Sequence, residues 1–95
     1  MDMNQKDMEQ ILINIVCNIQ KISGREEVPV TADTKPVLDI PGFDSLNGVE
    51  ATVEVLDQLG IDLDFNNVFV EDDSALTIQQ AATRLINAMA ALHKK

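Results

Sequence analysis

The sequence is poor in aromatic residues and in cysteine. Its 95 residues include three Phe, no Trp and no Tyr, so the core is expected to be aliphatic, which favours packed helices. Cys17 is the only cysteine and has no partner for an internal disulfide, which is typical of a cytoplasmic protein. The length predicts a single domain over residues 1–95, and we expect it to be a monomer.

Basic residues are scarce as well. Lys and Arg number 7 against 16 Asp and Glu, and the formal net charge is −9. The segment from Asp39 to Asp73 holds ten acidic residues and no basic one. Most often such a stretch is only a solvated face. Its charge would repel nucleic acid and anionic membranes but attract a basic protein surface, so neither nucleic acid nor membrane is expected as a partner.

Residues for most enzyme chemistry are missing. Cys17 and His93 are the only thiol and imidazole side chains and lie far apart in the chain, so no metal site is expected. No Gly-rich phosphate-binding loop is present. A Ser–His–acid triad would have to combine Ser45 with His93 on a domain too small for a substrate pocket. We therefore do not expect a free-standing enzyme.

Apolar residues at intervals of three and four predict three helices. In the first, about residues 4–22, they are Met8, Ile11, Leu12, Ile15, Ile19 and Ile22. In the second, about residues 45–59, they are Leu46, Val49, Val53, Leu56 and Leu59. In the third they are Ile78, Ala82, Leu85, Met89 and Leu92. Gly60 is placed to end the second helix, and Thr77 with Gln80 forms a capping box that starts the third.

Three segments allow more than one interpretation. Residues 24–44 contain three prolines, which exclude a continuous helix and predict a long loop. Residues 49–55 are rich in β-branched side chains and fit a strand on propensity, but the four-turn apolar spacing favours a helix. Residues 61–70 fit either a hairpin that turns at Asn66-Asn67 or a short helix at 66–70.

The stretch PGFDSLNGVE, residues 41–50, places Ser45 directly after Asp44, where the loop gives way to the second helix. An Asp-Ser pair in this position is most often a helix cap and nothing more. Alternatively, Asp44 caps the helix and leaves the Ser45 hydroxyl free at the surface. The N–H groups and the dipole of the helix N-terminus would then favour a phosphate esterified to Ser45.

The segment GFDSLNGVEATVEVLDQLGIDL resembles the central segment of acyl carrier proteins and peptidyl carrier domains. In that family a Gly, a variable residue and Asp-Ser-Leu open the second helix, and LTIQQAATRLI is similar to the closing helix. The resemblance extends over nearly the whole chain. It implies an all-α fold, a small acyl-carrier-like four-helix bundle. This bundle would have three longer helices, one short helix at 66–70, and a long loop between helices 1 and 2.

The resemblance also implies a function. Ser45 matches the attachment site of 4'-phosphopantetheine, and Asp44 matches the acid that helps the transferase and its metal ion engage that site. Four further residues match the helix face that partner enzymes recognise, namely Leu46, Val49, Glu50 and Glu54. The implied protein is a free-standing carrier that holds an acyl or aminoacyl group as a thioester. Its expected partners are a phosphopantetheinyl transferase and acyl- or aminoacyl-loading and processing enzymes with basic docking patches.

Some features depart from the fatty-acid carriers. Asn47 stands where those carriers usually have another acid, and residues 41–43 place a Pro and a bulky Phe close to the Asp-Ser pair. Gly48 and Thr52 are poor helix formers and predict a soft second helix. These differences favour a specialised pathway over housekeeping fatty-acid synthesis. The alternative function is that of an unmodified, carrier-like acidic adaptor that docks on basic partner surfaces.

Overall fold

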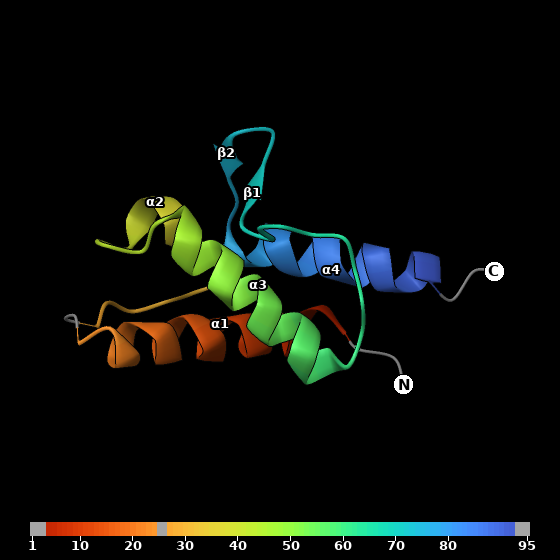
Figure 1. Cartoon of the computed structure of the whole chain (residues 1–95), viewed down its shortest axis with the longest axis horizontal. Helices are drawn as coiled ribbons and strands as arrows, with labels where there is room; N and C mark the ends of the chain where they lie inside the picture. The colour runs from red at the N-terminus through yellow and green to blue at the C-terminus, as the bar shows by residue number, and fades with distance from the viewer. Residues whose placement is uncertain (1–3, 25–26, 93–95) are drawn as a thin grey trace.

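The computed structural model describes residues 4–24 and 27–92, which form a helical bundle with one small hairpin (Figure 1). Its elements are α1 (Gln5–Ile22), α2 (Pro36–Asp39), α3 (Ser45–Leu59), β1 (Val70–Glu71), β2 (Ser74–Ala75) and α4 (Ile78–Leu92). The two strands pair antiparallel, with Val70 opposite Ala75. The expected fold class, a small all-α bundle of three longer helices and one short helix, is confirmed for the described residues.

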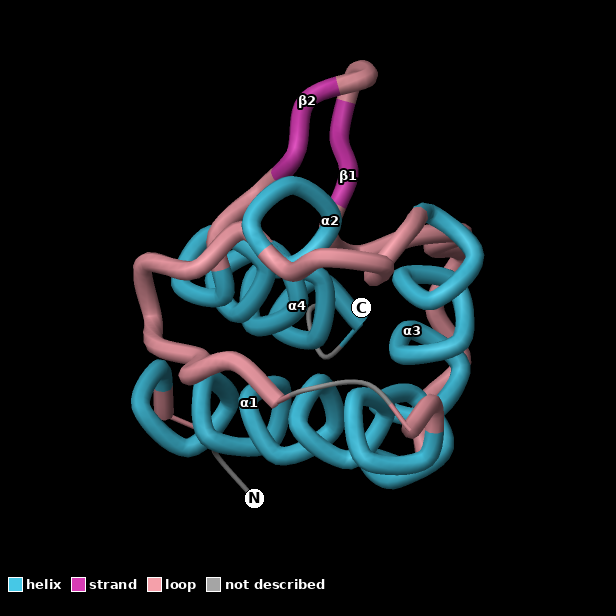
Figure 2. The backbone as a smooth tube through the Cα atoms, turned by 90° about the vertical axis from the view of Figure 1, so that its left-hand side faces the viewer, coloured by secondary structure: helices cyan, strands magenta, loops and turns pink. Residues whose placement is uncertain are grey.

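Helix α1 packs against both α3 and α4. In Figure 1, α4 lies above α1, and α3 crosses in front of α1 at an angle. Figure 2 shows the bundle from one end, with α2 near the base of the β1–β2 hairpin, which projects away from the helices. The long loop after α1 is fastened to the start of α4, because the carbonyls of Ala32 and Thr34 accept from the N–H groups of Gln79 and Ile78.

Local capping interactions set the ends of the helices as expected. Thr77 Oγ1 accepts from the Gln80 N–H at 3.0 Å, and Gln80 Oε1 accepts from the Thr77 N–H at 2.9 Å. This reciprocal pair is the predicted capping box of α4. Gly60 ends α3 with φ of 67°, in the left-handed region that glycine adopts without steric cost. Asn4 caps α1, whose predicted range is also confirmed.

The core is aliphatic, with two aromatic rings at one end. Its helical members are Met8, Leu12, Ile15, Val16, Ile19, Ala51, Val55, Ile78, Ala81, Ala82 and Leu85. Phe43 and Phe69 are both buried and meet edge to face, with ring centroids 6.3 Å apart. Phe43 comes just before α3, and Phe69 just before the hairpin, so this contact joins the two loops beside the start of α3.

Helix α3 is where it was predicted, but three of the five apolar residues that predicted it are exposed, while Leu56 and Leu59 pack partly buried against the core. Leu46, Val49 and Val53 are exposed at 75%, 39% and 65%. The buried residues of α3 are Gly48, Ala51, Thr52 and Val55. Because these side chains are small or absent, neighbouring segments approach the α3 backbone closely, and the three exposed apolar residues are left facing outward.

The short helix lies elsewhere than the resemblance implied. Residues 66–70 form no helix: they contain a turn at 68–69 and lead into β1. The hairpin turning at Asn66-Asn67 is also wrong, since the β1–β2 turn lies at Asp72 and Asp73, with φ of 50° and 64°. The one-turn helix is instead α2, within the predicted loop, where Pro36 occupies a first-turn position that needs no N–H donor.

Candidate functional site

Ser45 is the first residue of α3 and is exposed, and Asp44 is the N-cap. Asp44 Oδ1 accepts from the Asn47 N–H at 3.1 Å, and Asn47 Oδ1 accepts from the Asp44 N–H at 3.3 Å. This capping box uses the Asp44 carboxylate and does not involve the Ser45 hydroxyl. Among the described residues, that hydroxyl has no hydrogen-bond partner. The Ser45 side chain is therefore exposed at the surface and does not cap the helix.

The backbone around Ser45 suits an anion. The N–H groups of Asn47 and Gly48 are taken by the side chain and the carbonyl of Asp44. Those of Ser45 and Leu46 have no acceptor within the described part of the chain. Together with the positive end of the α3 dipole, they would stabilise a phosphodiester on the Ser45 oxygen. The residues present therefore fit the attachment of 4'-phosphopantetheine at this position.

An exposed strip of α3, here called the α3 face, runs down the helix from Ser45. It consists of Leu46, Val49, Glu50, Val53 and Glu54. Spacings of three and four place these side chains on one side of the helix. All four residues predicted to contact partners belong to it. Leu38 of α2 is also exposed, at 68%, and lies on a helix that packs against α3.

Two exposed apolar residues, Val53 of the α3 face and Leu38 of α2, were not among the predicted site residues. Val53 could have been found from its position four residues after Val49. Leu38 could not, because the one-turn helix that carries it gives no periodic signal in the sequence. Both add apolar area to a surface whose charged side chains are acidic.

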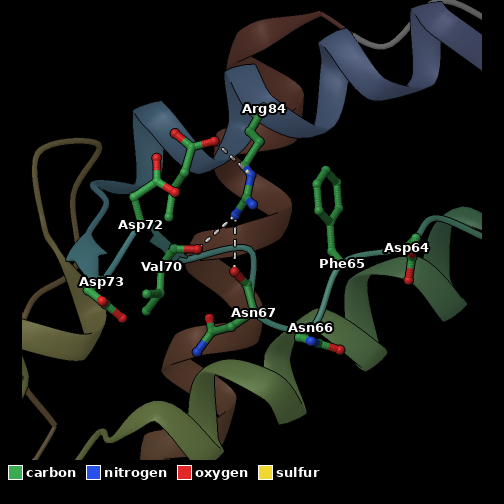
Figure 3. Close-up of a pocket in the computed structure, with 9 residues that line it drawn as sticks. Asp64, Phe65, Asn66, Asn67, Val70, Asp72, Asp73 and Arg84 are labelled. Carbon is green, nitrogen blue, oxygen red and sulfur yellow. Dashed lines mark hydrogen bonds and ion pairs between the residues drawn. The ribbon is translucent and has the colours of Figure 1, made fainter.

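On the other side of α3's first turns, segment 64–73 forms an open cavity with α4, of about 540 Å³ (Figure 3). Arg84 of α4 is one of the residues that line this cavity. Its Nη1 donates to three backbone carbonyls, those of Asn67 at 3.1 Å, Val68 at 3.3 Å and Val70 at 3.0 Å. Its Nε lies 3.6 Å from a Glu71 carboxylate oxygen, and its guanidinium stacks 4.5 Å from the centre of the Phe65 ring. Arg84 thus holds this segment in one conformation.

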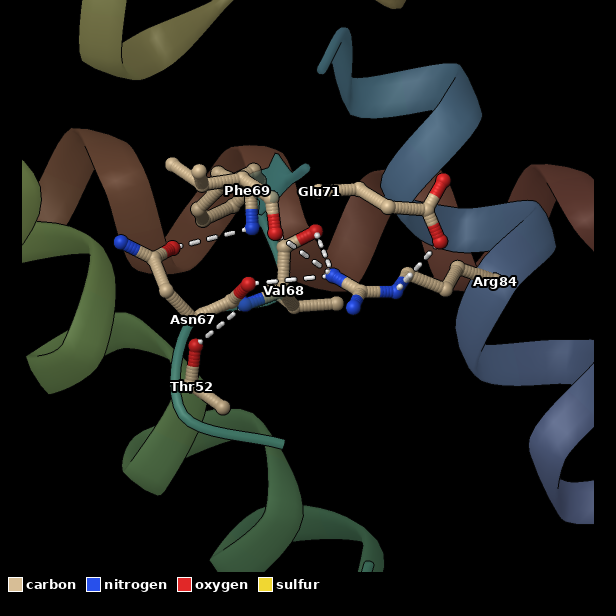
Figure 4. A network of polar contacts seen from close by, with 7 residues as sticks. Thr52, Asn67, Val68, Phe69, Glu71 and Arg84 are labelled. Carbon is tan, nitrogen blue, oxygen red and sulfur yellow. Dashed lines mark hydrogen bonds and ion pairs between the residues drawn. The ribbon is translucent and has the colours of Figure 1, made fainter. Parts of the chain in front are cut away.

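The same segment is fastened to α3 by Thr52 and Asn67 (Figure 4). Thr52 Oγ1 donates to the Gly48 carbonyl at 2.7 Å and accepts from the Val68 N–H at 2.9 Å. Asn67 Nδ2 donates to the Ser45 carbonyl at 3.1 Å. Gly48 and Thr52, which looked like weak points of a helix, are buried contact residues. The sequence contained no signal for this role, because the contacts join residues far apart in the chain.

Other chemistry is limited in the described residues. No group of three or more His, Cys, Asp or Glu side chains within 4–24 and 27–92 could hold a metal ion, and His93 lies outside these ranges. Cys17 is half-buried, and burial, followed by the nearby Glu27, raises the pKa of its thiol. No helix in the described part of the chain has the length and hydrophobicity to cross a bilayer.

Comparison with protein-family models, with curated proteins and with solved structures finds no match to this chain. The resemblance to carrier proteins therefore rests on the chain's own residues.

Proposed function

We propose that this protein is a free-standing acyl carrier protein, modified on Ser45 with 4'-phosphopantetheine. The observation that supports this most directly is the exposed Ser45 hydroxyl at the start of α3, which has no hydrogen-bond partner among the described residues and lies beside an N-cap supplied by Asp44. The bound arm would supply a thiol that carries an acyl or aminoacyl group as a thioester. The protein itself performs no catalysis.

In the proposed modification, the side chain of Ser45 acts as the nucleophile. The Ser45 oxygen attacks the phosphorus of coenzyme A that bears the pantetheine, and the bond from that phosphorus to 3',5'-ADP breaks. The hydroxyl proton passes to a base of the transferase, and 3',5'-ADP leaves. The N–H groups of Ser45 and Leu46 would stabilise the charge of the phosphate that remains. By resemblance, Asp44 helps the transferase and its metal ion to engage the site.

The α3 face would be the docking surface for partner enzymes. Its apolar side chains offer area to bury, while Glu50 and Glu54 attract a basic rim. Attraction of this kind speeds encounter without forming a long-lived complex, which suits a carrier that visits several enzymes. The proposal places the protein in the cytoplasm as a monomer, in a specialised acyl or aminoacyl pathway, without nucleic-acid or membrane partners.

The test is the intact mass of the protein after incubation with coenzyme A, Mg²⁺ and a broad-specificity phosphopantetheinyl transferase. We expect a gain of one phosphopantetheine in the wild type and in Ser74→Ala, which removes an exposed serine of the hairpin, and no gain in Ser45→Ala. In a Cys17→Ser background the unmodified chain has no thiol, so a thiol reagent should detect one new group after modification. A folded wild type without any mass gain would favour the unmodified acidic adaptor.

A further inference from the structure

Within the described residues, the side chain of Asn67 is the only one from the 64–73 segment that forms a hydrogen bond with the backbone of Ser45, 22 residues earlier. Its Nδ2 donates to the Ser45 carbonyl at 3.1 Å, and its Oδ1 accepts from the Phe69 N–H at 3.0 Å. Both ends of the amide are therefore used. One end holds the first turn of α3, and the other holds the turn that precedes β1.

The amide of Asn67 lies directly against Gly48. A Cβ atom at position 48 would stand 2.7 Å from Asn67 Cγ, and closer still to the two terminal atoms of the amide. No side chain other than hydrogen leaves room for Asn67 in this pose. The backbone of Asn67 is held independently, because its carbonyl accepts from Arg84 at 3.1 Å. The side-chain amide of Asn67 is thus held by Ser45, Phe69 and Gly48, and its backbone by Arg84.

The bond to the Ser45 carbonyl restrains the peptide plane that follows Ser45. In the first turn of a helix, the N–H of this peptide has no acceptor within the helix, so a bond from outside the helix limits fraying. The plane also sets the direction of the Leu46 N–H, one of the two free donors beside the Ser45 oxygen. An amide in contact with the carbonyl therefore controls the backbone that presents the hydroxyl, without touching the hydroxyl itself.

We propose that Asn67 is a positioning residue for modification of Ser45, an inference that rests on the proposed carrier function. Its N–H donor holds the first turn of α3 in the geometry in which the Ser45 oxygen meets the phosphorus of coenzyme A. Asn67 lies outside the α3 face, so it acts on the rate of transfer and not on docking. An ordered first turn raises the fraction of encounters that react.

Steady-state transfer of phosphopantetheine to Asn67→Ala and Asn67→Asp tests this role. Each variant loses the donor to Ser45, but Asn67→Asp keeps the acceptor for Phe69. We expect kcat to fall about tenfold in both, as the loss of one hydrogen bond implies, with KM unchanged. Asn66 is the matched position, because it is an adjacent, exposed asparagine whose side chain forms no hydrogen bond with the described residues. Asn66→Ala controls for truncation and Asn66→Asp for the added charge, and both should react like the wild type.

Several results would overturn the proposal. A wild-type rate for Asn67→Asp beside a slow Asn67→Ala would assign the effect to general packing of the loop. A raised KM with unchanged kcat would make Asn67 a docking contact. Amide hydrogen exchange at residues 45–49 supplies a readout that needs no transferase, and we expect faster exchange in both Asn67 variants. If the wild type is not modified, the proposed function fails, and unchanged exchange would separately reject the restraint by Asn67.

Discussion

At the scale of single residues, Gly48 shows how tertiary contact can reverse a helix propensity. In an exposed helix interior, replacing Gly with Ala stabilises by about 1 kcal/mol. Here the added methyl would displace the Asn67 amide and break its bonds to Ser45 and Phe69, each contributing about 1 kcal/mol. We expect Gly48→Ala to lower the free energy of unfolding by about 1 kcal/mol, as measured by urea denaturation.

The matched experiment repeats the substitution in an Asn67→Ala background. The displaced amide is then absent, so only the propensity term acts, and Gly48→Ala should raise the free energy of unfolding by up to about 1 kcal/mol. The change of sign between the two backgrounds measures the coupling of Gly48 and Asn67. If Gly48→Ala changed the free energy of unfolding equally in both backgrounds, the Asn67 amide would be able to move aside without loss of stability.

At the scale of elements, Asp44 at the start of α3 has one task that the structure shows and one that belongs to the proposed function. Its carboxylate caps the helix, and by resemblance it also engages the transferase. Asp44→Ala should cost about 1 kcal/mol of stability through loss of the cap. Asp44→Asn keeps an acceptor for the Asn47 N–H, so we expect near wild-type stability in thermal unfolding together with slower modification.

Thr77→Ala is the control for that prediction, because Thr77 caps α4 in the same way. It should cost a similar amount of stability and leave modification unchanged. If Thr77→Ala slows modification as much as the Asp44 variants do, then reduced stability alone explains the loss. If Asp44→Asn reacts at the wild-type rate, the charge of Asp44 has no part in the reaction.

At the scale of the whole molecule, the dominant feature is unbalanced negative charge. All ten acidic residues between Asp39 and Asp73 are exposed, which agrees with a solvated face. Within the described residues the only ion pair joins Arg84 to Glu71. The shorter dimensions of the molecule are 26 and 21 Å, and the Debye length is roughly 20 Å at ~0.02 M salt. At low salt, repulsion therefore acts across the molecule.

Raising NaCl from ~0.02 to ~0.3 M should consequently stabilise the protein by about 1 kcal/mol, or roughly 5 °C in Tm, while it weakens docking to a basic partner. The control is the double variant Asp72→Asn/Asp73→Asn. These two residues have positive φ, which Asn tolerates well, and the variant carries two fewer charges. The variant should have a higher Tm than the wild type at low salt, and this difference in Tm should become smaller as the salt concentration rises. A Tm independent of salt would show that the repulsion is negligible.

The candidate site was partly predictable because its main features are local. Asp44 caps α3 through a residue three positions away, so the Ser45 hydroxyl is not needed as the cap and has no partner in the described part of the chain. The exposure of the predicted docking residues was expected from the resemblance. The contribution of Asn67 was not predictable, because its partner Ser45 is 22 residues distant and an asparagine in a loop has many possible roles.

Local patterns in the chain account for the three long helices, the helix ends at Gly60 and Thr77, the aliphatic core and the exposed acidic segment. Periodicity, capping and charge act over a few residues, so they can be recognised in the chain. Local patterns did not reveal which side of α3 is buried, where the one-turn helix lies, or that the hairpin turns at Asp72-Asp73. These outcomes depend on close packing between distant segments. Small residues such as Gly48 allowed α3 to turn Leu46, Val49 and Val53 outward, where the proposed function needs them.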